Sequence, residues 1–326
     1  MITDLVQPQK TEAERLKAAC REIARQGLGI LVAIKYQVPN HPAKREKLDN
    51  VSGLENVTRY IVDSMKHEPN VLGWYVSDEN PIDEIPTICR LRETISERDP
   101  WHPTMTLTNV PGNFILFAKS GDYIMHDSYP VGIGAYKDGP VQTMDYSRRS
   151  LDDVKKVGTP FVWVPQIFPW GSSWKKLPNR YPTEVEMRSM ALLGAIYDAK
   201  AYFFYSYHHC FYYSEKLTPG YAETHWEHVK GAVAIINELT PYLLSREIAP
   251  ETAVKQTDGP KVLARAFSHG GKTAVVITAD GPGEASAEIT VKGKPGLKSK
   301  YGRTTETAPG IYRFNGLHID SDVLMD

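Results

Sequence analysis

The stretch HEPNVLGWYVSDENP, residues 67–81, decides the fold class of this chain. Its central run, residues 71–79, is almost continuously apolar and is short enough for a buried strand. A strand of that kind is typical of a parallel sheet with helices on its faces. The run ends in Asp78 and Glu79, and the Asn-Pro dipeptide that follows turns the chain out of the strand. Two carboxylates are therefore expected where this strand leaves the sheet.

A helical pattern precedes this strand, and the same pair of patterns recurs along the first three quarters of the chain. The predicted strands are residues 28–36, 71–79, 104–110, 123–129, 160–168 and 201–209. The predicted helices are residues 11–26, 54–67, 85–97, 113–119, 151–157, 183–199 and 222–244. Apolar strands that alternate with helices predict a parallel α/β sheet covered by helices.

The sequence changes in character after residue 245. Short alternating segments follow, separated by Gly and Pro clusters such as GPGE and GKPG; they are residues 262–267, 273–278, 285–291 and 311–315. This pattern is typical of a small antiparallel β-sandwich. We therefore expect a β/α-barrel domain of catalytic type over residues 1–245 and a C-terminal β-sandwich domain over residues 246–326.

The strand count leaves two architectures open for the first domain. We count six strand–helix units, whereas a TIM-type β/α barrel has eight. An open doubly wound sheet is the alternative, and a nucleotide-dependent enzyme would fit it, but such a sheet usually carries a glycine-rich phosphate loop. The turns KYQVPNHP and SDENPIDE contain no such loop. The sequence therefore favours an incomplete barrel that begins at the helix before its third strand.

An incomplete barrel has open edges at its first and last strands, residues 28–36 and 201–209. A second copy of the chain in a homo-oligomer, residues 1–10, or a piece upstream of this chain would have to cover them. The sequence does not decide among these.

Four segments resemble TIM-barrel glycoside hydrolases of the large retaining clan. Residues 67–81 are similar to the fourth-strand region, where a phrase close to "HPNVLGWYLADEP" ends in the acid/base carboxylate. MHDSYP (residues 125–130) looks like the sixth-strand phrase, FVWVPQIF (residues 161–168) like the seventh strand, and residues 182–207 like the seventh helix and eighth strand. The resemblance implies a glycosidase barrel that lacks its first two strands, is followed by a β-sandwich, and acts on a glycan or oligosaccharide.

One departure from the clan concerns the nucleophile. The clan places a carboxylate at the end of its seventh strand, and the matching residue here is Gln166. An amide cannot attack an anomeric carbon as a carboxylate does. A non-catalytic carbohydrate-binding barrel, or an inactive relative of the glycosidases, is therefore the alternative function.

Glu79 and Asp127 are the candidate catalytic pair, because each ends a predicted barrel strand. Glu79 is expected to be the general acid, with a pKa raised by an apolar surround or a nearby anion. A separation of roughly 6.5–9.5 Å between the two carboxyl groups would favour inversion, and roughly 5–5.5 Å would favour a covalent intermediate. The plainer interpretations are a capping or ion-paired Glu79 and an Asp127 that braces the turn at Pro130 or binds sugar hydroxyls.

Further polar and aromatic side chains at strand ends or in the loops beyond them are candidates for substrate binding. They are Lys35, Asp78, Tyr129, Trp163, Gln166, Trp170, Tyr205 and His208. Exposed rings at Trp170 and Trp174 would stack on pyranose faces, although buried indoles that anchor the loop would fit equally well. Lys35 would pair with a carboxylate or face solvent. The adjacent histidines 208 and 209 point apart on a strand, so no metal site is expected there.

Composition excludes several function classes. A net charge of −1 over 326 residues gives no electrostatic reason to expect nucleic acid or a membrane surface as a partner. No apolar run reaches roughly 18 residues, and the N-terminus lacks a signal-peptide pattern. The three cysteines are far apart and show no disulfide or metal spacing. We therefore expect a soluble protein, of undetermined compartment, that binds a carbohydrate and needs no cofactor.

Overall fold

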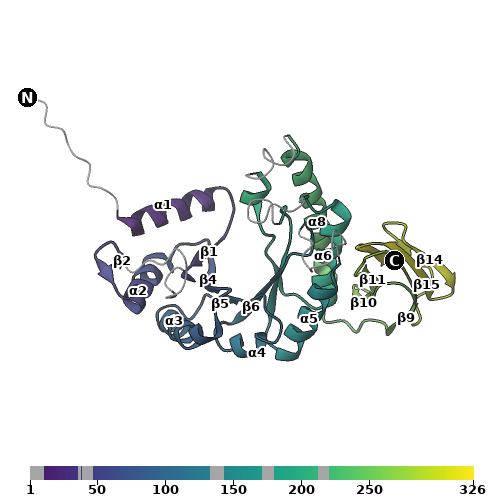
Figure 1. The fold of residues 1–326 in the computed structure, drawn as a ribbon, viewed down its shortest axis with the longest axis horizontal. Helices are drawn as coiled ribbons and strands as arrows, with labels where there is room; N and C mark the ends of the chain where they lie inside the picture. The colour runs from purple at the N-terminus through teal and green to yellow at the C-terminus, as the bar shows by residue number, and fades with distance from the viewer. Residues whose placement is uncertain (1–10, 36–37, 39–46, 133–142, 171–179, 212–219) are drawn as a thin grey trace, which may run out of the picture. The chain divides into compact units, whose positions relative to one another are not determined.

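The computed structural model describes residues 11–35, 38, 47–132, 143–170, 180–211 and 220–326 (Figure 1). The chain divides into two compact units. The first comprises Met1–Met125 with Val157–Pro160, and the second comprises His126–Lys156 with Phe161–Asp326. The domain boundary expected at residue 245 stays a prediction.

Six strands form one parallel sheet of half-barrel type. They are, in spatial order, β1 (Ile30–Ala33), β4 (Val71–Asp78), β5 (Thr104–Leu107), β6 (Tyr123–Ser128), β7 (Phe161–Pro165) and β8 (Ala201–Tyr202). Each strand lies beside the one that follows it in this set, whereas a doubly wound sheet reverses its order at a switch point. This sequential order confirms the incomplete barrel, and the doubly wound alternative was wrong.

Helices follow the strands in the order that the sequence predicted. They are α1 (Glu12–Arg25), α2 (Leu54–Met65), α3 (Ile85–Arg98), α4 (Phe114–Phe117), α5 (Asp145–Val157), α6 (Glu184–Ile196) and α8 (Ala222–Leu243), with a short 3₁₀ turn η2 (Ile82–Glu84). Capping boxes start α1 and α6, where Thr11 pairs with Glu14 and Thr183 with Glu186. Within the described residues, no helix is long and apolar enough to cross a membrane.

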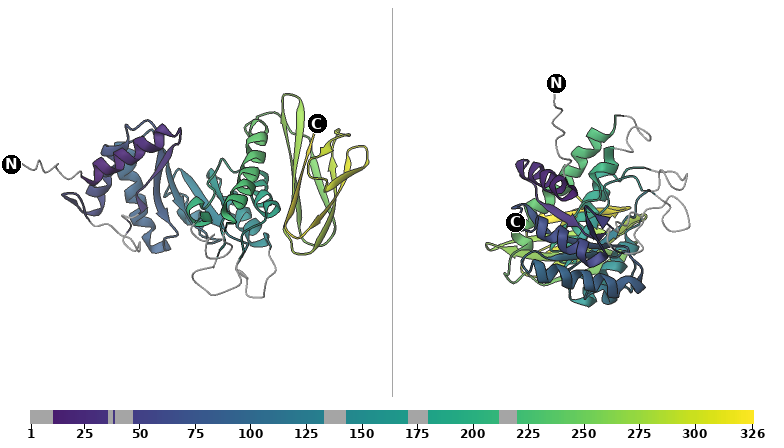
Figure 2. Two further views of the ribbon diagram at one scale, coloured as in Figure 1. Left: turned by 90° about the horizontal axis from the view of Figure 1, so that it is seen from above. Right: turned by 90° about the vertical axis from the view of Figure 1, so that its left-hand side faces the viewer.

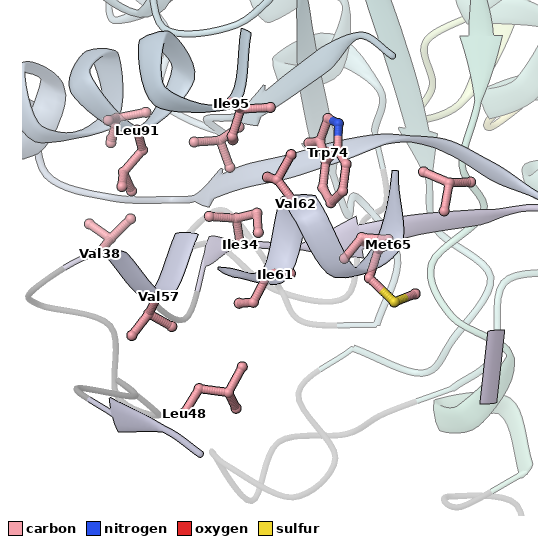
Figure 3. Close-up of a cluster of buried hydrophobic side chains, with 14 of the residues drawn as sticks. Ile34, Val38, Leu48, Val57, Ile61, Val62, Met65, Trp74, Leu91 and Ile95 are labelled. Carbon is pink, nitrogen blue, oxygen red and sulfur yellow. The ribbon is translucent and has the colours of Figure 1, made fainter. Parts of the chain in front are cut away.

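The first unit has its own core between strands β1 and β4 and the helices α1, α2 and α3. Figure 3 shows Ile34 and Trp74 from the strands directed toward side chains of α2 and α3. The Trp74 indole N–H donates to the buried Asp99 carboxylate over 3.0 Å, which satisfies the one polar atom of that ring. Since these strand residues face the helices, their neighbours Lys35 and Tyr75 lie on the opposite face of the sheet.

Several predicted strands are shorter in the structure than the sequence indicated, and the first and last of the sheet, β1 and β8, are the examples that matter here. Strand β1 covers Ile30–Ala33 of the expected residues 28–36, and Tyr36 lies outside the described residues. Strand β8 ends at Tyr202, and residues 207–211 are helical. The Ser206 hydroxyl accepts from the His209 backbone N–H over 3.3 Å, which caps that helical turn and ends the extended segment. Cover for the outer edges of β1 and β8 stays a prediction.

The C-terminal part of the second unit is a β-sandwich of two four-stranded antiparallel sheets (Figure 2). One sheet has the order β10 (Val262–His269), β11 (Lys272–Ala279), β16 (Asp320–Met325) and β13 (Lys298–Ser299). The other has the order β14 (Thr304–Ala308), β15 (Ile311–Leu317), β12 (Glu284–Val291) and β9 (Thr252–Asp258). The predicted sandwich is confirmed, and four of its eight strands, β9, β13, β14 and β16, were missed. A hairpin of β2 (Lys47–Leu48) and β3 (Val51–Ser52) was also not predicted.

Within the second unit, α6 packs against the sandwich as well as against the barrel strand β7. The Arg188 guanidinium lies 3.7 Å from the centroid of the Tyr301 ring and donates to the Ser321 hydroxyl over 3.2 Å. The Ser189 hydroxyl also bonds to that of Ser321, at 2.9 Å. Since Arg188 is buried, its charge is desolvated and relies on these partners. The sandwich is therefore held by specific polar contacts as well as by apolar packing.

A second polar junction joins α5 to the sandwich. Arg148 of α5 donates to the Asp280 carboxylate over 2.6 Å, and it also pairs with Asp145 and Asp152. The pKa of Asp280 is raised to about 6, mainly by burial and to a smaller extent by the carboxylates of Asp145 and Asp152, while Arg148 opposes this shift. Relative to the unfolded chain, the folded state therefore favours the protonated form of Asp280, whose side chain is 2% exposed.

This preference predicts a pH-dependent stability. The pKa of Asp280 in the folded state lies above its unfolded value of about 3.9. The contribution of Asp280 protonation to the free energy of unfolding is therefore complete below about pH 4 and is lost as pH rises through about 6. In Asp280→Asn the titration is absent. The free energy of unfolding of the variant, relative to the unsubstituted protein, should therefore rise by about 3 kcal/mol between pH 4 and pH 8.

Denaturant titrations at several pH values measure this difference. Asp83→Asn, which replaces an exposed carboxylate, is the control and should show no such trend. A pH-independent difference for Asp280→Asn would contradict the shifted pKa.

Candidate functional site

The carboxyl ends of β1 and β4 carry an ion pair. Lys35 pairs with Asp78, and its ammonium group lies 4.9 Å from the centroid of the Tyr75 ring. The Asp78 backbone N–H donates to the Asn80 side chain over 3.0 Å, which forms the turn that follows the strand. Of the two roles considered for Lys35, the structure shows pairing with a carboxylate, and that carboxylate is Asp78.

Glu79 stands immediately after this pair in an unusual backbone conformation. Its φ is 52°, in the left-handed region that non-glycine residues rarely adopt. The Glu79 N–H donates to Leu107 O over 3.1 Å, which ties this residue to the neighbouring strand β5. Such strained residues occur preferentially at functional sites. The side chain is exposed rather than enclosed by apolar groups, so the predicted apolar surround is not the environment that the structure gives it.

Asn109 is the polar neighbour of Glu79. Its amide donates to the Glu79 carboxylate over 2.5 Å from the chain just beyond β5. Sequence reasoning missed this residue, although it lies at the end of a predicted barrel strand, residues 104–110, as the chosen candidates lie at the ends of theirs. The rule that strand ends carry functional groups would have found it.

Asp127 lies near the end of β6 and is 5% exposed. The register of the sheet pairs Leu107 with Asp78 on one side and with Met125 on the other. Asp127 follows Met125 by two residues along β6. Glu79 belongs to the first compact unit and Asp127 to the second, and the separation of their carboxyl groups stays a prediction.

Five rings of the second unit form one group of neighbouring aromatic side chains. One of them, Tyr129, follows Asp127 by two residues in the sequence. The Tyr129 ring lies 5.0 Å from Phe168, 5.8 Å from Trp170 and 5.8 Å from Tyr205, with the last pair stacked at 25°. The His209 ring lies 5.5 Å from Phe168 and 5.2 Å from Tyr205. We call Tyr129, Phe168, Trp170, Tyr205 and His209 the aromatic cluster. All but Phe168 are partly exposed.

The structure thus brings together three of the predicted substrate-binding residues, Tyr129, Trp170 and Tyr205. His208 is exposed on the helical residues 207–211, with its ring 5.3 Å from that of His209. Burial, and then the neighbouring His208, lower the pKa of His209. Trp174 lies outside the described residues. No cluster of three or more His, Cys, Asp or Glu side chains within the described ranges has the geometry to hold a metal ion.

The side-chain amide of Gln166 makes three hydrogen bonds, all of them to backbone groups. Its amide N–H groups donate to Val131 O over 2.5 Å and to Phe168 O over 2.8 Å, and its side-chain oxygen accepts from the Val131 N–H at 2.9 Å. The residue is fully buried. These bonds fix the chain after β6 to the chain after β7, the two segments that carry Tyr129 and Phe168. A direct contact with substrate stays a prediction that this placement does not favour.

Trp163 has a similar interior position. Its indole N–H donates to Met190 O over 2.8 Å, and its ring lies where a Cβ on Gly194 would come within 2.5 Å. The glycine therefore allows α6 to approach β7 closely. The ring is fully buried, so this placement does not favour the predicted contact of Trp163 with substrate either.

A buried polar group beneath the aromatic cluster was not predicted. The His225 ring nitrogen Nε2 lies 2.6 Å from Ile167 O, and Cys210 Sγ donates to the same carbonyl over 2.9 Å. The Tyr181 hydroxyl donates to Cys210 O over 2.8 Å. Burial lowers the pKa of His225, so the neutral ring is favoured and Nε2–H is the donor. His225 belongs to the buried side of α8.

Comparisons with known proteins place the fold but not the family. No family model and no curated protein matches the sequence. Among solved structures, one described as a glycoside hydrolase matches with a TM-score of 0.59 and 13% identity, over 99% of this chain and 80% of that one. A variant of AmyP in complex with maltotriose matches with a TM-score of 0.58 and 10% identity, over 96% and 78% of the two chains.

A catalytic mutant of Gan42B, a family 42 β-galactosidase from G. stearothermophilus, matches with a TM-score of 0.55 and 9% identity, over 96% of this chain and 90% of that one. Identities this low show a shared architecture and carry no residue-by-residue correspondence. The chain has the fold of the TIM-barrel glycoside hydrolases, reduced to six parallel strands and followed by a β-sandwich.

Proposed function

We propose that this chain is a glycoside hydrolase that acts on a glycan or oligosaccharide. The observation that carries the proposal is the aromatic cluster, which follows the strand-end carboxylate Asp127 by only two residues at Tyr129. Partly exposed rings stack on the apolar faces of sugars, and a carboxylate beside them can reach the glycosidic bond. The glycoside hydrolases of similar fold support the substrate class.

Glu79 is the proposed general acid. Parallel strands place their carboxyl ends at one edge of a sheet, so β4 and β6 are expected to deliver Glu79 and Asp127 to the same edge. The hydrogen bond from Asn109 and the left-handed backbone hold the Glu79 carboxyl group in a defined position. Protonated Glu79 would donate its proton to the leaving oxygen, while Asp127 acts as the second carboxylate.

Replacing Glu79 by Gln tests this role. The amide keeps the size and hydrogen bonding of the side chain but cannot supply the proton. Turnover of a cleavable glycoside should fall by at least about a hundredfold, with unfolding unchanged. Asp83→Gln is the matched control, because Asp83 is an exposed acid in the turn that follows. Retained turnover in Glu79→Gln would remove Glu79 from the mechanism.

Gln166 occupies the position at which the retaining clan has its nucleophilic carboxylate, and its hydrogen bonds predict what a carboxylate there would do. Because the Gln166 amide donates to two backbone carbonyls, a carboxylate there would face two oxygens without a hydrogen to offer. Gln166→Glu should therefore destabilise the fold by about 2 kcal/mol or more without raising activity. Thermal unfolding and turnover of the variant measure both effects. Increased turnover would show instead that a nucleophile had been restored.

The alternative function, carbohydrate binding without cleavage, also rests on Gln166. An amide stands at the clan's nucleophile position, and its side chain is used up in bonds to backbone. Trp170→Ala separates recognition from chemistry. Loss of one stacking ring should weaken oligosaccharide binding by about tenfold, as measured by calorimetry, whether or not the bond is cleaved. Trp101→Ala is the control, because Trp101 is 87% exposed and belongs to the other compact unit. Saturable binding without hydrolysis across a broad glycan panel would favour the alternative.

A further inference from the structure

A cavity lies in the second compact unit, lined by none of the residues of the aromatic cluster. It has a volume of about 370 Å³. Its walls are the C-terminal end of α8, the connection to β9, the middle of β10 and the turn after α6. Small-molecule sites typically occupy about 300–1,000 Å³. The cavity is therefore large enough for one small ligand.

The charged side chains around this cavity leave an excess of one positive charge. Lys200, Arg246 and Arg265 line it together with Asp198 and Glu247. The Asp198 carboxylate lies 2.8 Å from the Lys200 ammonium and 3.9 Å from the Arg265 guanidinium, so it is already shared between two cations.

Glu247 is also satisfied by the protein. Its carboxylate accepts from the backbone N–H groups of Gly270 and Gly271 at 2.8 and 3.3 Å, and these bonds lower its pKa. Arg246 is exposed and has no ion-pair or hydrogen-bond partner within the described parts of the chain. One guanidinium is thus available for an anion that comes from outside.

The remaining walls are aromatic and apolar. Tyr242 lies on one side and Phe267 on the other, with the Arg265 guanidinium 4.9 Å from the centroid of the Phe267 ring. Arg265 is also held by Ile196 O, to which it donates over 2.9 Å. An aromatic wall suits the apolar face of a sugar ring, and a guanidinium suits a carboxylate.

We propose that this cavity is a second binding site, separate from the candidate active site, and that it takes a monoanionic sugar such as a uronic acid. The sugar carboxylate pairs with Arg246, and the ring lies against Tyr242. The site recognises an acidic unit independently of any cleavage at Glu79. It would bring an acidic glycan to the protein through the sandwich side of the second unit.

The test is a titration of the full chain with D-glucuronate, with D-glucose as its neutral counterpart and inorganic phosphate as an anion without a sugar ring. Calorimetry should show saturable binding of glucuronate and at least about tenfold weaker binding of glucose and phosphate. Arg246→Ala should weaken glucuronate binding by about tenfold. Because Arg246 is exposed and has no partner among the described residues, this substitution leaves the fold intact.

Two controls locate the effect. Arg313→Ala removes the same charge from an exposed position of β15 outside the cavity and should leave binding unchanged. Trp170→Ala alters the aromatic cluster and should also leave glucuronate binding unchanged. Equal binding of glucose or phosphate, an unaffected Arg246→Ala variant, or a loss of binding in Trp170→Ala would each overturn the proposal.

Discussion

The hydrogen bonds of the Gln166 amide are the interaction on which the candidate site depends. This buried side chain ties the segment after β6 to the segment after β7 through two bonds to the Val131 backbone, and a third bond to Phe168 O fixes it within its own segment. Loops beyond barrel strands have few backbone partners of their own, so a bridging amide can take the place of missing sheet bonds. The positions of Tyr129 and Phe168 follow from it. The aromatic cluster is therefore positioned by the buried side chain of Gln166, which itself has no contact with solvent.

The alternation of strands and helices was predictable because buried parallel strands are apolar along their whole length. Strand β4 was found almost to the residue, and so was α3. The sandwich strands that were missed lack such an apolar run, and β16 shows the physical reason. Strand β16 contains Asp320 and Asp322, which look like solvent-exposed residues in a polar tail. Both are buried, Asp320 beside Arg303 at 2.9 Å and Asp322 beneath the N–H groups of Tyr301 and Arg303.

Part of the candidate site was also predictable from the sequence. Strand-end position identified Glu79, Asp127 and Tyr129, because barrel geometry places such residues at one edge. Position alone does not tell whether a polar side chain faces a ligand or a neighbouring loop. Gln166 and Trp163 are the examples: Gln166 bonds to the Val131 backbone 35 residues away in sequence, and Trp163 to Met190 O 27 residues away. Only the folded chain brings those partners together.

Helix α6 has a consequence for how such a chain can change over evolution. Every residue from Glu186 to Ile196 is buried, since the helix is enclosed by β7, α8 and the sandwich strands β11 and β16. A surface helix has a polar side that tolerates almost any neighbour, but this one has none. A recombination event that exchanged the sandwich for another module would have to replace the matching side of α6 as well. The two parts are thus expected to be inherited together, although the sequence separates them by the whole of α8.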